Sequence, residues 1–139
     1  MLVLDTNHIR EIAFSTALGL LLKERMERAD TDCVVTVVSA EECLRGWLAR
    51  LAAAREIPEQ ISGYRQLTDF INFLAEYTLL PWDEDAALRA KHLRTQGIRI
   101  GTMDLRIACI TIEHDATLLT RNTVDFAKVP GLRFENWLD

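Results

Sequence analysis

The segment CVVTVVS, residues 33–39, is β-branched at most of its positions, and its run of valines is interrupted only by Thr36. Such a run is typical of a strand that is covered on both faces, as strands of parallel sheets are. Shorter runs predict further strands at Leu2–Leu4 and at Ala116–Thr120 (ATLLT). LLPW, residues 79–82, predicts a short strand, and LRFENW, residues 132–137, predicts an edge strand.

Helical patterns separate these strands. Apolar residues recur at helical spacing over residues 15–28, 40–55, 58–77, 84–97 and 103–114. Pro58 suits the first turn of its helix, Asp83 is a favoured N-cap, and Gly97 suits a helix end. Strands that alternate with helices predict an α/β fold: three layers, α/β/α, around a central parallel sheet. The length of 139 residues predicts one domain spanning residues 1–139.

Composition narrows the class of function. The net charge of −5 argues against nonspecific binding to long nucleic acid duplexes, but not against a small phosphodiester site that contains a metal ion. No apolar run reaches the roughly 20 residues that span a bilayer. No secretory signal is visible, and the three cysteines lack the spacing of a zinc site or a disulfide framework. The expected compartment is the cytoplasm.

Acidic and amide residues follow the predicted strands. Asp5 comes directly after the first strand, and Glu42 lies about one helical turn past the second. Asn122 and Asp125 follow the ATLLT strand, and Asp104 begins the buried helix that leads into that strand. Ligands of open parallel sheets bind beyond the carboxyl ends of the strands. We therefore expect these side chains to meet at one edge of the sheet.

Each residue also has a purely structural interpretation. Asp5 could cap a following turn. Glu42 could close a capping box that begins at Ser39, and Asp104 could cap its helix or complement the positive end of that helix. Asn122 and Asp125 could be ordinary turn residues. Taken singly, none of the five requires a catalytic role.

Taken together, the acids favour a metal site. Four carboxylates gathered at one edge would repel one another unless positive charge lay between them. Hard oxygen ligands in that number suit Mg²⁺ or Mn²⁺. An ion held in this way can activate water, neutralise phosphate oxygens and stabilise a leaving alkoxide. The sequence therefore predicts hydrolysis of a phosphodiester, with one or two ions.

Four segments carry a resemblance to a known family: LDTN (4–7), SAEECLRG (39–46), IGTMDLRIA (100–108) and LLTRNTVDFAKVPGL (118–132). They resemble the spaced motifs of the PIN-domain ribonucleases, and more narrowly the VapC-type toxins of toxin–antitoxin pairs. The resemblance implies a three-layer PIN-like fold and a metal-dependent endoribonuclease.

The resemblance also assigns residues. It places the catalytic, metal-binding acids on Asp5, Glu42 and Asp104, with Asp125 as the fourth. Asn122 stands where many members have an acid, and is expected to be a neutral ligand or to orient water. Further polar residues are expected to line the site: Thr6, Asn7, Ser39 and Thr120.

Three partners are implied by the same resemblance. They are an RNA substrate, a small cognate antitoxin that lies in an apolar groove, and a second copy of the chain in a homodimer. The helix that contains Trp47, Leu48 and Leu51 and the helix that contains Phe70 and Phe73 offer apolar surface, although such faces usually belong to the core.

Two other functions remain possible at this point. Phosphatases that use a nucleophilic aspartate after the first strand need a second acid two residues later, where this chain has Asn7. A catalytically weak or inactive PIN-fold module that only binds an antitoxin-like partner is favoured by the amide of Asn122 alone.

Overall fold

Five strands form one parallel sheet, in the order β3-β2-β1-β4-β5, in the computed structural model of residues 1–139. The strands are β1 (Leu2–Leu4), β2 (Cys33–Thr36), β3 (Leu79–Leu80), β4 (Thr117–Leu119) and β5 (Arg133–Glu135). At the centre, Val3 of β1 lies opposite Val34 of β2 and Leu118 of β4. The predicted parallel sheet is confirmed, including the short strand in LLPW and the edge strand in LRFENW.

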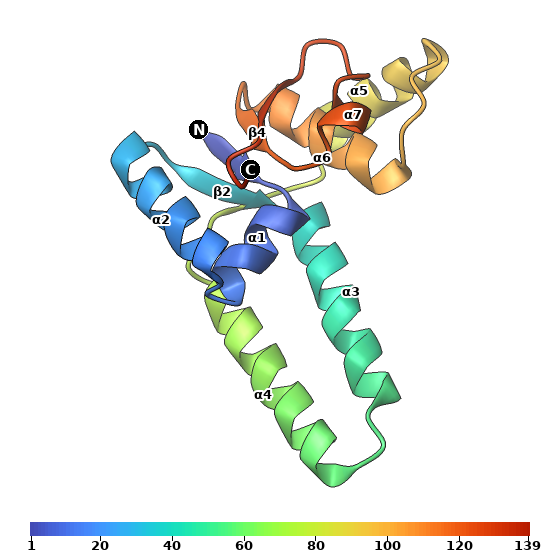
Figure 1. Ribbon diagram of the computed structural model, residues 1–139. Helices are drawn as coiled ribbons and strands as arrows, with labels where there is room; N and C mark the ends of the chain where they lie inside the picture. Colours follow the sequence, from blue (N-terminus) through green and yellow to red (C-terminus); the bar gives the residue numbers. More distant parts are fainter.

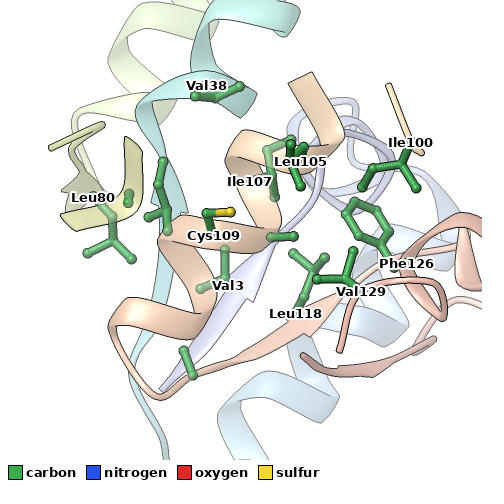
Figure 2. Packing of buried hydrophobic residues seen from close by; sticks show 14 of the residues in the cluster. Val3, Val38, Leu80, Ile100, Leu105, Ile107, Cys109, Leu118, Phe126 and Val129 are labelled. Atoms are coloured by element: carbon green, nitrogen blue, oxygen red, sulfur yellow. The ribbon is translucent and has the colours of Figure 1, made fainter. Parts of the chain in front are cut away.

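Helices cover both faces of this sheet (Figure 1). They are α1 (Thr6–Ala13), α2 (Ala17–Ala29), α3 (Val37–Ala53), α4 (Ile57–Leu74), α5 (Glu84–Thr95), α6 (Thr102–Glu113) and α7 (Thr123–Phe126). Leu2 and Leu4 point into a core shared with α1 to α4, whereas Val3 points into a second core shared with α5, α6 and α7 (Figure 2). Apolar side chains on both sides of each central strand explain why residues 33–36 are apolar without alternation. No helix combines the length and the apolar character needed to cross a membrane.

The second strand is shorter than predicted. It ends at Thr36, and α3 begins at Val37, although the valines continue to residue 38. The Thr36 hydroxyl accepts a hydrogen bond from the Ser39 backbone N–H at 3.0 Å, so Thr36 is the N-cap. This cap overrides the β preference of Val37 and Val38, since propensity is a weak constraint beside capping and packing. The capping box from Ser39 to Glu42 is therefore wrong.

Two helices were missed by the sequence analysis. Helix α1 begins directly after Asp5, whose side chain accepts a hydrogen bond from the Thr6 backbone N–H at 2.8 Å. The structural interpretation of Asp5 as a cap is thus confirmed, but for a full helix. Helix α7 follows Asn122 and has only four residues, too few for a periodic pattern to be recognised.

The other predicted elements lie close to their expected bounds. Pro58 is in the first turn of α4, and Asp83 caps α5 through a hydrogen bond from the Ala86 N–H. Helix α4 ends at Leu74, three residues before the expected end at Tyr77.

His8, which is fully buried in α1, connects this helix to the C-terminal segment. Its Nε2 atom accepts a hydrogen bond from the Trp137 backbone N–H at 3.3 Å, so Nδ1 carries the proton and donates to Asn7 Oδ1 at 2.7 Å. Only the neutral ring satisfies both partners. Burial and the nearby Arg121 charge lower the pKa of His8 to about 4, although Asp139 opposes them.

This pKa predicts acid sensitivity of the fold. The pKa of His8 is about 4 in the folded protein and about 6.5 in the unfolded chain. Between these two pH values the unfolded chain is protonated at this histidine and the folded protein is not. The free energy of unfolding that is due to His8 is therefore complete above pH 6.5 and declines as pH falls toward 4. Between about pH 7.5 and about pH 5, the loss should reach about 2 kcal/mol. Urea unfolding of wild type and His8→Gln at both pH values should show a smaller loss in the variant. Equal losses in the two proteins would contradict a neutral, buried His8.

Candidate active site

The carboxyl ends of the two central strands bring polar residues together. Asp5 directly follows β1, and Thr120 directly follows its neighbour β4. Helix α3 starts at the end of β2 and carries Glu42 in its second turn. Helix α6 carries Asp104 in its first turn. This is the edge of the sheet at which the sequence analysis expected the acids to meet.

Asp5 is the most buried of these acids, with 4% of its surface exposed. One carboxylate oxygen accepts the Thr6 N–H, and the other accepts the hydroxyl of Thr120 at 2.6 Å. Burial raises the pKa of Asp5 even though both hydrogen bonds favour the charged form. The two bonds fix the direction of the carboxylate, and burial makes its charge costly in the absence of a cation.

Glu42 faces Asp5 from α3. Its Oε2 atom accepts a hydrogen bond from the Thr6 hydroxyl at 3.3 Å. Its Oε1 atom is buried and has no hydrogen-bond partner. Burial, followed by the charges of Asp5 and Asp104, raises the pKa of Glu42. A buried carboxylate oxygen without a partner is unusual, because it loses hydration and gains nothing in return.

Asp104 completes a set of three interacting acids. Its Oδ2 atom accepts a hydrogen bond from Asn122 Nδ2 at 3.3 Å. Burial, and then the charges of Asp5 and Asp125, raise the pKa of Asp104. Helix α6 has no side-chain cap, so Asp104 is not an N-cap, although its place in the first turn is favourable for the helix dipole.

Asn122 and Asp125 lie beside Asp104. The Asn122 amide donates to Asp125 Oδ2 at 3.1 Å as well as to Asp104, and so bridges two carboxylates. Asp125 also accepts a hydrogen bond from Lys128 at 3.2 Å. The hydrogen bonds from Asn122 and Lys128 lower the pKa of Asp125. Asp125 therefore differs from the three inner acids: its charge is already compensated, and its side chain is partly exposed at the rim.

The four residues expected to line the site fall into two groups. Thr6 and Thr120 donate their hydroxyl protons to Glu42 and Asp5. Asn7 instead accepts from His8 and from the Arg121 backbone N–H, and Ser39 pairs with Thr36. Asn7 thus links α1 to the loop after β4, Ser39 lies at the N-terminus of α3, and neither is hydrogen-bonded to a carboxylate.

Two residues at the rim were missed by the sequence analysis. Lys128 pairs with Asp125, and the i, i+3 spacing of these two residues was the available signal. Arg121, the residue between Thr120 and Asn122, forms ion pairs with Glu11 and Asp139, and no local pattern could have revealed these pairs.

The donor set fits a hard divalent cation. As the side chains stand, no group of three acidic, histidine or cysteine residues is arranged to hold a metal ion. Each of the three inner carboxylates accepts a hydroxyl or amide hydrogen bond: Asp5 from Thr120, Glu42 from Thr6 and Asp104 from Asn122. A cation beside the unpartnered Oε1 of Glu42 would stabilise the charges of the three inner acids, whose pKa values are raised by burial and, for Glu42 and Asp104, also by neighbouring carboxylates. Oxygen donors of this kind suit Mg²⁺ or Mn²⁺.

Known proteins share sequence or fold with most of this chain. Residues 2–132 match the PIN domain family. Ribonuclease VapC2 of Rickettsia felis is 35% identical over 69 residues, covering 47% of this chain and 52% of the relative. Ribonuclease VapC of Rickettsia bellii is 39% identical over 72 residues, covering 48% and 54%. The matched part thus spans about half the length of these curated relatives.

Solved structures extend the likeness to the whole chain. A chain of the DNA-bound VapBC structure from Salmonella typhimurium superposes with a TM-score of 0.75 at 22% identity, covering 98% of this chain and 97% of that chain. VapBC-1 from nontypeable Haemophilus influenzae gives a TM-score of 0.75 at 22% identity, covering 99% and 98%. At such identities the likeness shows the fold alone.

Proposed function

This chain belongs to the PIN domain family, and from this premise we propose that it is a metal-dependent endoribonuclease that acts as the toxin of a toxin–antitoxin pair. One observation carries the proposal: three acids from separate elements, Asp5, Glu42 and Asp104, interact electrostatically, and one of their oxygens is buried without a partner. The names of the relatives, ribonucleases of the VapC type, support the reaction.

Asp5, Glu42 and Asp104 are the proposed catalytic acids, which would hold Mg²⁺ or Mn²⁺, with Asp125 as the fourth. When bound, the ion supplies Lewis acidity to a phosphodiester and to the attacking water. The chain's own contribution is orientation: the Thr120 and Thr6 hydroxyls fix the carboxylates of Asp5 and Glu42.

We propose that Asn122 positions two of the acids and is not itself an acidic ligand. Its amide nitrogen faces two carboxylates, Asp104 and Asp125, and keeps them together without adding negative charge. We assign Asn122 as the residue that positions these acids, while Asp125 supplies the fourth carboxylate at the rim.

The proposed partners follow from the same assignment. The proposed substrate is RNA, and the proposed compartment is the cytoplasm. Structures titled VapBC complexes support a small cognate antitoxin as the inhibitor. We also propose a homodimer.

One alternative has support in the structure. A catalytically weak module that only binds a partner is favoured by the lack of a ready three-acid group for a metal ion and by the amide at position 122. An aspartyl-nucleophile phosphatase is disfavoured, because the side chain two residues after Asp5 is Asn7, which bonds to His8.

Metal-dependent RNA cleavage is the test of the proposed function. Purified protein should cleave cellular RNA with Mg²⁺ or Mn²⁺, and an excess of EDTA should abolish cleavage because the acids alone cannot activate water. The matched control is Asp32→Asn, an exposed aspartate before β2, which should cleave as wild type does. If no divalent ion supports cleavage, or if Asp5→Asn prepared in parallel cleaves equally, the binding module is the better conclusion.

A further inference from the structure

Helices α1 and α3 lie against each other beside the inner acids (Figure 1). Thr6 of α1 and Glu42 of α3 are hydrogen-bonded across this contact at 3.3 Å. Arg10 and Gly46 follow four residues later on the same faces, one turn or about 5.4 Å further along each helix. A Cβ atom on Gly46 would lie 3.9 Å from a guanidinium nitrogen of Arg10 and would meet no other side chain or neighbouring element within 4 Å. The Arg10 side chain therefore extends across α3 at a position where α3 has no side chain.

Arg10 is exposed, and its guanidinium group forms no ion pair within the protein. It differs in this respect from Arg121, which is paired with two carboxylates. The Cys43 thiol reports the position of Arg10 relative to the acids: burial raises the pKa of this thiol to about 11, the charge of Arg10 opposes that effect, and the charge of Glu42 adds to it. A free guanidinium fork thus lies close to the inner acids, and its planar array of N–H donors matches two oxygens of a phosphate.

Arg50 extends the positive charge by one more turn of α3. It lies four residues after Gly46, and its guanidinium group lies over the Trp47 ring, 4.9 Å from the ring centroid. The net charge of the protein is −5, yet Arg10 and Arg50 are the only charged residues that line the cleft between these helices. A single-stranded nucleic acid that is held at the inner acids can therefore continue past two positive charges.

We propose that Arg10 binds the RNA phosphate next to the one that is cleaved, and that Gly46 leaves the space for its guanidinium group. This inference rests on the proposed ribonuclease function and names a residue that positions the substrate for it. A strand that leaves the inner acids along the contact between α1 and α3 reaches Arg10 after one helical turn and Arg50 after two. Forked, charge-assisted hydrogen bonds from Arg10 to the phosphate fix the direction of the strand.

RNA binding tests this assignment in the Asp5→Asn background and in EDTA, so that the strand is not cut. Fluorescence anisotropy of a labelled single-stranded RNA oligonucleotide gives the dissociation constant at several KCl concentrations. Arg10→Gln should raise the dissociation constant about tenfold and reduce the slope of log affinity against log salt by about 0.7, the value of one lost phosphate contact. Arg10→Lys should keep that slope, because it keeps the charge. The matched control is Arg28→Gln, which should change neither quantity, since Arg28 is exposed at the end of α2, before β2 begins and so at the opposite edge of the sheet.

Substitutions of Gly46 test the geometry without removing the charge. Gly46→Ala adds only a Cβ atom at an ordinary van der Waals distance from Arg10, and should bind RNA as the parent protein does. Gly46→Met fills the space occupied by the guanidinium group and should weaken RNA binding severalfold. Combined with Arg10→Gln, it should cause no further loss, because both changes remove the same contact. Thermal unfolding of each variant verifies that the fold is retained.

Cleavage measured with Mg²⁺ or Mn²⁺ in the protein with Asp5 intact separates this inference from the proposed function. There Arg10→Gln should raise KM more than it lowers kcat, because the contact is made in the bound substrate as well as in the transition state. No measurable RNA binding, an affinity and salt slope unchanged by Arg10→Gln, or an equal loss in Arg28→Gln would overturn the assignment of Arg10. A protein that cleaves RNA normally with Arg10→Gln keeps the proposed function without this assignment.

Discussion

Asp5→Asn is expected to lower the rate of RNA cleavage by roughly 10²–10³-fold, the equivalent of about 3–4 kcal/mol of transition-state stabilisation. Asn has nearly the size of Asp and can keep both structural bonds. Its amide oxygen can accept the Thr6 N–H, and its NH₂ group can donate to the Thr120 hydroxyl. The substitution therefore removes the charge that would hold a cation, with little effect on the cap of α1.

Stability measurements separate this role from a structural one. Since burial raises the pKa of Asp5, its charge destabilises the metal-free fold, and the melting temperature of Asp5→Asn in EDTA should equal or exceed that of wild type. Asp5→Ala, which also deletes the cap, should lose about 1 kcal/mol more than Asp5→Asn. If Asp5→Asn unfolded more easily while retaining cleavage, Asp5 would be a cap and nothing else.

Which residues would meet at the site was predictable in outline, because most of them follow the carboxyl ends of neighbouring parallel strands. A parallel sheet places every strand's carboxyl end at one edge, so Asp5 and the loop after β4 could be placed together from their sequence positions alone. The orientation of individual side chains was not predictable in this way. The Asn7 Oδ1 atom accepts hydrogen bonds from its neighbour His8 and from the backbone N–H of Arg121, and the second of these bonds joins residues 114 positions apart in sequence.

The boundary between β2 and α3 also could not be predicted from the sequence. Residues 33–39 have one continuous β-branched pattern, and no local signal distinguishes the strand residue Val35 from the helical Val37. The boundary is set by the Thr36 cap and by packing of Val38 into the second core. The helix starts three residues earlier than expected. Glu42 therefore lies in the second turn of α3, where it faces Asp5, and not in the first turn, where a capping box would have placed it.

Glu42→Gln is expected to change activity and stability in opposite directions. Cleavage should fall by roughly 10²-fold or more, because a carboxylate that would hold the cation is lost. The metal-free protein should become more stable by about 1 kcal/mol, because a charged oxygen that is buried without a partner is replaced by a neutral amide. Thr6 can still donate to the amide oxygen, and the neutral side chain no longer repels the carboxylates of Asp5 and Asp104.

The pH dependence of this stability difference provides the decisive control. Because the pKa of Glu42 is raised in the folded state, the folded protein takes up a proton at a higher pH than the unfolded chain does. The destabilisation of wild type is therefore complete above the folded pKa. It declines as pH falls from there to the ordinary glutamate pKa, below which both states are protonated. Urea unfolding in EDTA should show the gain of Glu42→Gln at neutral pH and its loss in acid, whereas Mg²⁺ or Mn²⁺ should stabilise wild type more than the variant. A gain that is independent of pH would mean that Glu42 takes up its proton at the same pH in the folded and unfolded protein, so that neither burial nor the neighbouring acids penalise its charge. That result would remove the electrostatic basis for a cation at this edge of the sheet.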